Sequence, residues 1–479
     1  MLRILSNPVL PVAIAFVFRV GLLHTWAFSV DEAYELYAVS LPFTAMLRFL
    51  AETDAHPPLF YTLLWLWTRS GIPLTEFYVR LPFALLGALT VALLYVLAAS
   101  FLGKRTALLA AYLLALSPLH VRWSHEARMF SLATLVATLV AFSLLKALAT
   151  GHRPYWFAYA LSLAAAFYTL YTLPLLAITY VLTALLSQRQ TSARLRILLF
   201  TLLAFLVFLP WASFLAVQAH DEHLSLSGPD LPGALWTIRL LVLGPLPTGA
   251  IYAKLLVYAC VLFALAAGAR RVAASYAGRF LLVGAVFPIL AASLIVVRAE
   301  PLLRPVRLLL PVLPNAATIL AAGLNSFPLS LRLPAVSMLL GTNLWSLSYS
   351  LREWPYVSDF ERLTRFLLAH SRPNDYYIAY PRHVAYALHF YARRYGVDVS
   401  GNVKAYQGKS DLNLIEARVK AAEQVWVIHD NASRRTPRVY LLLSKRFCMR
   451  RDEFFGNAVL LRFSEPKCLR PRQRSCAAC

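Results

Sequence analysis

The sequence predicts a polytopic α-helical membrane protein with about eleven transmembrane helices, in a range of nine to thirteen, and interfacial helices in the first outer loop. A soluble α/β domain is expected at the C-terminus. Of the 479 residues, 59% are apolar and 14% are charged, and the mean hydropathy is +0.61. Soluble domains average about 45–50% apolar and about 25% charged residues. The composition therefore excludes a soluble enzyme, a disordered protein and a disulfide-linked scaffold.

Apolar runs of about 20 residues are long enough to cross a bilayer as helices. The first run is too long for a signal peptide and lacks a small-residue cleavage site, so we expect it to remain as a span. The third and sixth runs are shorter than the others. The predicted spans are residues 9–28, 81–102, 106–120, 129–149, 155–171, 173–188, 196–216, 250–268, 280–297, 307–324 and 333–350.

Two further apolar stretches are predicted to lie along the outer membrane surface. The stretch PLFYTLLWLW after His56 covers about 11 residues with its flanks, which is about 16 Å of helix and too short to cross the bilayer. Its Trp65 and Trp67 are typical of the membrane interface. The stretch at 231–246 is broken by Pro and Gly and is interpreted in the same way.

The charges favour one orientation of the predicted spans. The 46 Lys and Arg residues exceed the 23 Asp and Glu residues, giving a formal charge of +23. With the N-terminus inside, the inner loops carry twelve Lys or Arg and no acidic residue, whereas the outer loops carry ten Lys or Arg and eleven acidic residues. Cation-rich inner loops are typical of the cytoplasmic side. We therefore expect a multi-pass protein of the plasma (inner) membrane, with a cytoplasmic N-terminus and an extracytoplasmic C-terminal domain.

The character of the sequence changes at Arg352, where charged and aromatic residues mix and short strand-like runs such as VWVIHD and AVLLRF appear. We predict a transmembrane domain at residues 1–351 and an extracytoplasmic α/β domain at residues 352–479. The second has 128 residues, enough for its own core. A disulfide between Cys448 and Cys468 in an oxidising compartment is left open.

A pair of carboxylates, Asp31 and Glu32, follows the first span in the sequence SVDEAYELY. A carboxylate at the mouth of a membrane bundle is a candidate general base. Ser29 and Glu32 also have the spacing of a capping box, which gives Glu32 a structural alternative. For Asp31 the only structural alternative is a favourable position in the field of the helix dipole.

A second polar group, in ETDAHPPLFY, contains Asp54 and His56. Both are candidate substrate-binding residues, and the Pro pair after them stiffens the backbone and starts the interfacial helix. The structural alternative is a loop that only turns the chain.

Cationic residues gather in SPLHVRWSHEARMF, at the outer end of the third span. Arg122 and Glu126 have the i, i+4 spacing of a structural ion pair. His125 and Arg128 lie on another face and are candidates to present cations to a substrate. Arginine suits phosphate because its planar guanidinium group binds two oxygens at once.

Arg304 and Arg307 lie at another outer membrane boundary, in RAEPLLRPVRLLLP. Side chains that extend to the interface as membrane anchors are the structural alternative. All these polar groups are expected on one outer face at the level of the lipid headgroups. Their combination suits an anionic lipid phosphate held by cations while a carboxylate activates a nucleophile.

Four segments, in this order, resemble the family 39 glycosyltransferases: DEAYELY, DAHPPLFYTLLWLW, RLPFALLGALTVALLYVLA and LLALSPLHVRWSHEARMFSL. These are polytopic enzymes of the GT-C class, related to protein O-mannosyltransferases and lipid A aminoarabinose transferases. The resemblance covers about residues 25–150. The sequence at 304–314 is similar to a later stretch of the family, with Leu308 where Tyr is usual.

The resemblance implies transfer of a sugar from a polyprenyl-phosphate donor to a lipid, glycan or protein acceptor on the extracytoplasmic face, by inverting displacement. It implies that Asp31 is the catalytic base and that Arg128 and Arg307 contact the phosphate. His56 stands where relatives often carry the Lys of Lys-Pro-Pro, and His125 stands where Gln is more usual. No cofactor is expected, a divalent metal is not favoured, and nucleic acid is not an expected partner.

Two alternatives come from other classes of protein. A non-catalytic transporter or lipid flippase is expected to carry ionisable residues near the span midplanes and inverted repeats. The charge gathers instead at the outer ends, and only Arg19 lies within an early span. An outer-face receptor or scaffold leaves the first-loop acids unexplained, and substitution of Asp31 is then silent.

Overall fold

The structure is a computed structural model, and the chain separates into two compact units. The first consists of Met1–Leu23 and Phe43–Glu353, and the second of His24–Pro42 and Trp354–Cys479. The sequence predicts one boundary after residue 351, whereas the compact units group residues 24–42 with the C-terminal part. The structure describes residues 6–54, 56–219, 226–227, 239–246, 251–294, 296–297, 306–352, 359–372, 374–399, 402–405, 415, 424–430, 443, 447–455 and 458–466.

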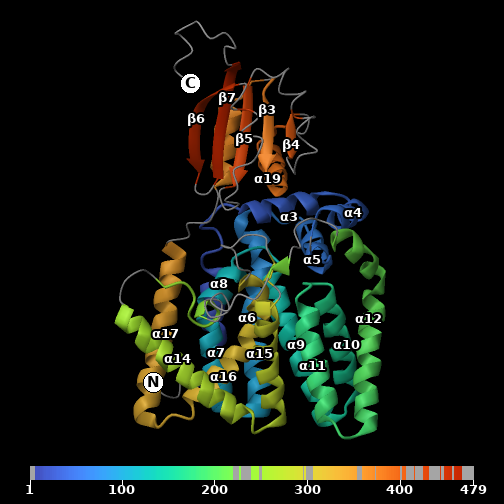
Figure 1. The fold of residues 1–479 in the computed structure, drawn as a ribbon, viewed down its shortest axis with the longest axis vertical. Coiled ribbons are helices and arrows are strands. Elements are labelled where there is room, and N and C mark those ends of the chain that lie inside the picture. Colours follow the sequence, from blue (N-terminus) through green and yellow to red (C-terminus); the bar gives the residue numbers. More distant parts are fainter. Residues whose placement is uncertain are drawn as a thin grey trace. The chain divides into compact units, whose positions relative to one another are not determined.

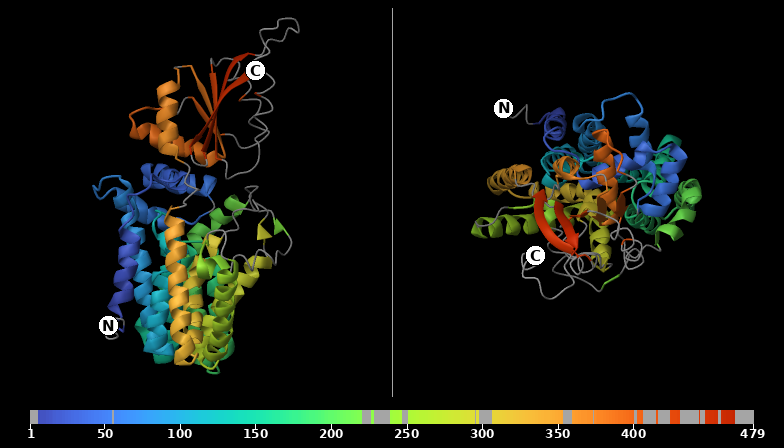
Figure 2. Two further views of the ribbon diagram at one scale, coloured as in Figure 1. Left: turned by 90° about the vertical axis from the view of Figure 1, so that its left-hand side faces the viewer. Right: turned by 90° about the horizontal axis from the view of Figure 1, so that it is seen from above.

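The first unit is mostly helical, and its longer helices run side by side (Figures 1 and 2). Among the described residues, five helical segments are long and apolar enough to cross a membrane: Glu76–Leu102, Phe130–Thr150, Thr191–Leu215, Ile251–Val272 and Val306–Leu324. The prediction of a helical membrane protein is confirmed at this level. The helices of the unit are α2 (Val9–Val20), α4 (Phe43–Thr53), α5 (Leu59–Thr68), α6 (Glu76–Leu102), α7 (Lys104–Ala115), α8 (Pro118–Ser124), α9 (Phe130–Thr150), α10 (Arg153–Phe167), α11 (Leu173–Ser187), α12 (Thr191–Ala219), α14 (Ile251–Val272), α15 (Tyr276–Leu294), the 3₁₀ helix η1 (Val306–Val312), α16 (Leu313–Leu324) and α17 (Leu329–Arg352).

Some predicted spans form shorter helices than their apolar runs. The run 9–28 is helical only as far as Val20, and the chain turns from Gly21 onward. In the run 280–297, α15 ends at Leu294, and β2 (Val296–Val297) pairs antiparallel with β1 (Leu226–Ser227). Helix α5 has ten residues, a length that fits an interfacial helix. The stretch 231–246 lies partly outside the described residues, so the predicted number of spans stays a prediction.

Two glycines let α14 and α16 approach closely. A Cβ atom added to Gly268 would overlap the backbone of Ile319, and one added to Gly323 would overlap the backbone of Ala264. Small residues at such crossings are typical of helices that pack in membranes, where close van der Waals contact replaces the hydrophobic effect as the main attraction.

Arg19, the charged residue of the first predicted span, ties α2 to α7. Its side chain is fully buried, and its guanidinium group donates hydrogen bonds to the carbonyl oxygens of Leu114 and Ala115 at 3.1 and 3.0 Å. These carbonyls belong to the last turn of α7, where no intrahelical donor is available. The group also donates to Nδ1 of His120 at 2.6 Å. Arg19 therefore donates to buried carbonyl oxygens at the end of α7.

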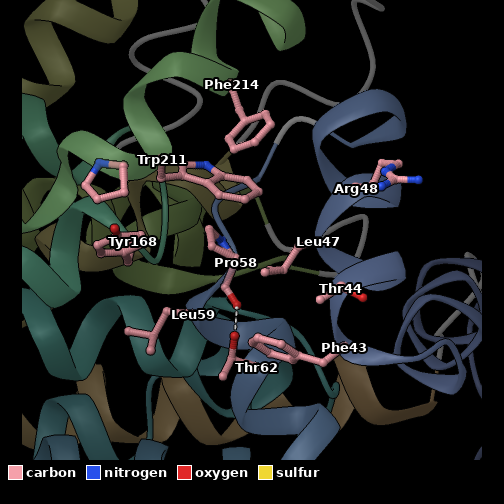
Figure 3. A pocket seen from close by; sticks show the side chains of 11 residues that line it. Phe43, Thr44, Leu47, Arg48, Pro58, Leu59, Thr62, Tyr168, Trp211 and Phe214 are labelled. Atoms are coloured by element: carbon pink, nitrogen blue, oxygen red, sulfur yellow. Dashed lines mark hydrogen bonds between the residues drawn. The ribbon is translucent and has the colours of Figure 1, made fainter.

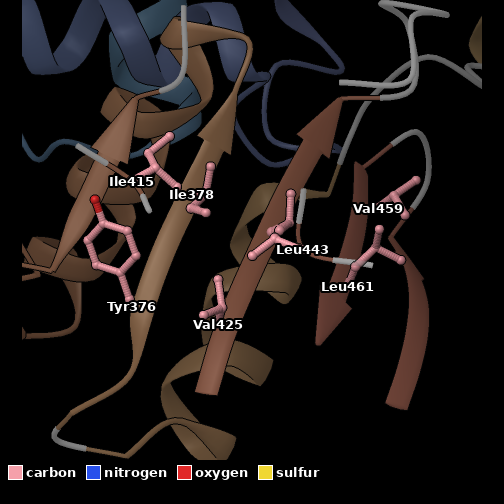
Figure 4. Close-up of a cluster of buried hydrophobic side chains, with 8 residues drawn as sticks. Tyr376, Ile378, Ile415, Val425, Leu443, Val459 and Leu461 are labelled. Carbon is pink, nitrogen blue, oxygen red and sulfur yellow. The ribbon is translucent and has the colours of Figure 1, made fainter. Parts of the chain in front are cut away.

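The second unit combines one helix from the first loop with a mixed sheet. The sheet order is β4-β3-β5-β7-β6, in which β3 is parallel to β4 and β5, and β7 is antiparallel to β5 and β6. Ile378, Val425 and Leu461 are among the buried side chains that form its core (Figure 4). The predicted strands VWVIHD and AVLLRF lie in β5 and β7, while Cys468 lies outside the described residues. The elements are α3 (Val30–Ser40), α18 (Phe360–His370), β3 (Tyr376–Tyr380), α19 (Arg382–Arg394), β4 (Val403–Ala405), β5 (Gln424–Asp430), β6 (Phe447–Phe455) and β7 (Ala458–Pro466).

Candidate functional site

The two predicted catalytic carboxylates lie in the first turn of α3, in the second unit. The side chain of Ser29 accepts a hydrogen bond from the Glu32 N–H at 3.2 Å, and the Glu32 carboxylate accepts one from the Ser29 N–H at 2.9 Å. The capping box is therefore formed, and Glu32 is only 1% exposed. Asp31 is partly exposed in the same turn. This geometry gives Glu32 a structural role at the start of α3, whereas Asp31 is the more accessible of the two residues.

Asp54 and His56 lie in the first unit, between α4 and α5, and are in contact. The Asp54 carboxylate lies 2.7 Å from His56 Nδ1 and also accepts a hydrogen bond from the hydroxyl of Tyr61. The Asp54 side chain is 8% exposed and that of His56 is 21% exposed. A carboxylate beside Nδ1 orients the imidazole ring, so that Nε2 is the ring nitrogen left to face a ligand.

Tyr61 is a member of this cluster that the sequence did not single out. It lies within the motif DAHPPLFY, and its side chain is almost fully buried in the first turn of α5. Because α5 starts immediately after the Pro pair, its first turn comes close to Asp54. The short spacing between Asp54 and Tyr61 in the sequence is the signal that could have predicted this contact.

Three arginines surround one pair of aromatic rings where α8, α9 and η1 meet. The guanidinium carbon of Arg122 lies 5.1 Å from the ring centroid of Trp123, and that of Arg128 lies 5.5 Å from the ring of Phe130. The guanidinium carbon of Arg307 lies 5.8 Å from both rings. These separations allow cation–π attraction. The structure therefore brings the predicted Arg128 and Arg307 to one place and adds Arg122.

The predicted ion pair between Arg122 and Glu126 is present, with 3.7 Å between the nearest nitrogen and oxygen atoms. Three guanidinium groups therefore lie close to one another beside Glu126 and the two aromatic rings. An arrangement of this kind suits an anion with several oxygens, such as a phosphate. Arg304, which was predicted to join the same group, lies outside the described residues.

His125 behaves differently from the prediction that it presents a cation. It lies between α8 and α9, outside the five long apolar segments, and its ring Nε2 is 2.7 Å from the carbonyl oxygen of Phe18. The pKa of His125 is lowered to about 4, mainly by burial, although the hydrogen bond to Phe18 acts in the opposite direction. The charges of Arg19, Arg80 and Arg122 contribute to the lowering. The ring is therefore neutral at pH 7, and it secures the end of α2 rather than offering a charge.

An apolar cavity of about 700 Å³ lies in the first unit next to the Pro pair (Figure 3). The carbonyl oxygen of Tyr168 accepts a hydrogen bond from the N–H of Leu59 at 2.9 Å, which joins the start of α5 to the end of α10. Trp211 and Phe214 of α12 form another wall. The cavity suits a hydrocarbon chain. Its lining residues are Phe43, Thr44, Leu47, Arg48, Pro58, Leu59, Thr62, Tyr168, Pro210, Trp211 and Phe214.

Within the described part of the chain, no group of three His, Cys, Asp or Glu side chains has an arrangement that could hold a metal ion.

Residues 55–214, about a third of the chain, match a protein family described as dolichyl-phosphate-mannose-protein mannosyltransferase. The matched region starts beside His56 and includes Arg122, Trp123, Arg128 and Phe130, whereas Arg307 lies outside it. No curated protein sequence matches the chain significantly.

The fold is similar to that of solved membrane proteins. ArnT from Cupriavidus metallidurans in the apo state aligns with a TM-score of 0.63 and 15% identity, over 95% of this chain and 97% of that one. The same protein bound to undecaprenyl phosphate gives a TM-score of 0.61, 14% identity and the same coverage. The oligosaccharyltransferase AglB from Archaeoglobus fulgidus, with an inhibitory peptide and a dolichol-phosphate, gives 0.55 and 12%, over 92% of this chain and 72% of that one. The predicted resemblance to the GT-C fold is confirmed.

Proposed function

We propose that this chain is a membrane glycosyltransferase that moves a sugar from a polyprenyl-phosphate donor to a lipid, glycan or protein acceptor. The observation that carries the proposal is the match of residues 55–214 to the dolichyl-phosphate-mannose-protein mannosyltransferase family. Similar folds bind undecaprenyl phosphate in ArnT and a dolichol-phosphate in AglB, which supports a lipid-linked donor.

In the proposed reaction, the acceptor hydroxyl attacks the anomeric carbon on the face opposite the phosphate. A bond forms between the acceptor oxygen and this carbon while the bond from the carbon to the phosphate oxygen breaks, and the configuration inverts. Asp31 takes the hydroxyl proton as general base. The polyprenyl phosphate departs as an anion, so the reaction needs no general acid.

The first unit supplies the groups that stabilise the departing phosphate. Arg128 and Arg307 donate hydrogen bonds to the phosphate oxygens, and these hydrogen bonds strengthen as negative charge develops on the oxygens. Arg122 joins them as a third donor, and Arg304 is proposed to lie in the same group. His56, oriented by Asp54, donates through Nε2. The apolar cavity beside Pro58 takes part of the isoprenoid chain.

We further propose eleven spans, a cytoplasmic N-terminus and an extracytoplasmic α/β domain at residues 352–479, in the plasma membrane. The cation-rich inner loops support this orientation. Alkaline phosphatase is active only outside the cytoplasm, so a fusion of this enzyme after Cys479 is expected to be active. An inactive fusion that is expressed at a normal level contradicts the orientation.

Substitution of Asp31 tests the function. Membranes that contain the Asp31→Asn variant are expected to lose transfer from radiolabelled polyprenyl-phosphate sugars by at least a hundredfold, because the amide cannot accept the proton. A panel of hexose and pentose donors covers the unknown sugar. The matched control is Glu52→Gln, an exposed carboxylate of α4. Transfer by Asp31→Asn at the wild-type rate contradicts the proposal.

The transporter alternative depends on ionisable groups inside the bundle. Arg19, the charged residue of the first span, donates to the backbone carbonyls of Leu114 and Ala115 and so serves the packing of α2 on α7. This observation favours the enzyme over the transporter.

A further inference from the structure

Within the second unit, the helix that carries Asp31 packs on the C-terminal helix α19 (Figure 1). The rings of Tyr34 and Tyr37 both lie against Tyr386, with centroids 5.5 and 4.9 Å apart. The ring of Tyr37 also lies 6.0 Å from that of His389. Aromatic pairs at these separations attract each other beyond the burial of their surfaces. One side of the middle of α3 is therefore held by α19.

The start of α3 is tied to α19 by a hydrogen bond. The hydroxyl of the fully buried Tyr391 donates to the carbonyl oxygen of Phe28 at 2.8 Å. The ring of Phe28 lies 5.9 Å from that of Phe390. Phe28 directly precedes Ser29, the N-cap of α3. The bond therefore holds the backbone three residues before Asp31.

Helix α3 depends on these contacts for its position. It has eleven residues, and isolated helices of fewer than about 12–15 residues are only marginally stable in water. Eight of its eleven residues are buried, so it is held by packing rather than by its own propensity. A general base acts only within hydrogen-bond reach of the proton, about 2.6–3.2 Å. A displacement of about 1 Å at a reacting group can lower the rate about a hundredfold.

We propose that α19 positions the helix carrying Asp31, and that Tyr386 and Tyr391 are positioning residues for sugar transfer. The inference rests on the proposed function, in which Asp31 is the base. It gives the C-terminal part of the chain a role in the rate of the chemical step. The competing interpretation is that the same contacts stabilise only the second unit.

The test compares full-length variants in detergent with a lipid-linked donor and a measured kcat and KM. Tyr391→Phe removes one oxygen atom and is expected to lower kcat about fivefold, the effect of one net hydrogen bond, with an unchanged donor KM. Tyr386→Ala removes the ring contacts with Tyr34 and Tyr37 and is expected to lower kcat about 10- to 100-fold. Tyr386→Phe keeps the ring and is expected to retain the wild-type kcat.

The matched control is Tyr395→Phe, at the residue that directly follows α19. The Tyr395 hydroxyl donates to Glu361 of α18 at 2.6 Å, so the variant loses a hydrogen bond of the second unit that does not involve α3. Its kcat is expected to stay at the wild-type value. Hydrogen exchange of the amides at residues 29–36 is expected to accelerate in Tyr391→Phe and Tyr386→Ala, but not in Tyr395→Phe.

The outcomes separate this proposal from the proposed function. Unchanged kcat and exchange in Tyr391→Phe and Tyr386→Ala, in a protein that Asp31→Asn inactivates, overturns the positioning role and leaves the transferase intact. Equal loss of kcat in Tyr395→Phe also overturns it, because general destabilisation then explains the effect. Wild-type transfer by Asp31→Asn overturns the proposed function itself. If Tyr386→Ala does not fold, Tyr391→Phe decides, since it removes a single atom.

Discussion

The two units hold their candidate chemical groups by different physical means. In the first unit, Arg128 and Arg307 lie where helices of the bundle meet, against the shared rings of Trp123 and Phe130, and Arg128 is only 5% exposed. In the second unit, Asp31 is partly exposed on an eleven-residue helix held by packing on α19. The proposed anion-binding groups are thus part of the bundle, whereas the position of the proposed base depends on the packing of α3 against α19. Substitutions in the first unit are expected to act on the groups themselves, and those in the second through geometry.

The largest effect is expected from removing a guanidinium group of the first unit. Arg128→Ala and Arg307→Ala are each expected to lower kcat about 10²- to 10³-fold, because each removes a donor to the developing phosphate anion. Arg128→Lys keeps the charge but loses the planar fork, so an intermediate loss is expected. The control is Arg69→Ala. This variant also loses an arginine that lies over an aromatic ring, since the guanidinium carbon of Arg69 is 3.9 Å from the ring centroid of Trp65. A kcat within twofold of the wild type in either alanine variant contradicts the assignment.

A smaller effect is expected at His56, at the edge of the same unit. His56→Gln is expected to lower kcat/KM for the donor about tenfold, because the variant lacks the ring nitrogen that Asp54 orients. His56→Lys supplies a cationic donor at this position and is expected to retain most of the activity. His152→Gln, at an exposed loop before α10, serves as the control. Equal activity of the Gln and Lys variants shows that charge at this position is not used.

In the second unit, a change of pH is expected to loosen the packing of α18 on α19. Burial raises the pKa of Glu361, but hydrogen bonds from Tyr395 and Arg365 outweigh it, so the pKa in the folded chain is lower than the ordinary value. The pair therefore stabilises the fold above the ordinary carboxyl pKa, and the stability is lost as pH falls through the lowered value.

The effect is expected to be small, because Arg365 is exposed and solvent screens its ion pair with Glu361. Amide exchange of α18 at pH 3.5 and pH 6 measures it, with α9 of the first unit as an internal reference. Glu361→Gln is expected to remove the difference between the two pH values. The same pH dependence in this variant and in the wild type points to another group.

Removal of divalent cations is expected to leave the rate of sugar transfer unchanged. The arginines provide the charge that would otherwise come from a metal ion at the departing phosphate. Transfer is measured in excess EDTA and again after addition of Mg²⁺ or Mn²⁺. A loss of more than tenfold that either ion reverses contradicts the prediction and adds a metal to the site.

The sequence predicts features whose signal lies within a few residues. The capping box of Ser29 and Glu32, the pair Arg122–Glu126 and the short helix α5 are of this kind, since each follows from spacing or length. The contact between Phe28 and Tyr391 joins residues 363 positions apart, and no local pattern encodes it.

The charge of His125 shows a second limit of prediction from the sequence. Its spacing to Arg128 suggests two cations on one face, but the protonation of a histidine depends on burial and on its neighbours. The structure buries the ring among arginines and lowers its pKa to about 4. In the same way, the convergence of Arg122 and Arg307 on Trp123 depends on the packing of η1 against α8 and α9, which only the folded chain shows.

The contact of Arg19 with the end of α7 has a consequence for biosynthesis. A charged side chain in an apolar helix is costly in a bilayer until it meets polar partners, by about 2.5–3.5 kcal/mol at the helix centre on insertion scales. The carbonyl of Leu114 that receives Arg19 lies 95 residues later in the chain. Within α2, the guanidinium group also donates to the carbonyl oxygen of Ala15. Its acceptors in α7 become available when α7 packs against α2, so we expect insertion of α2 to become more favourable once α7 is in place.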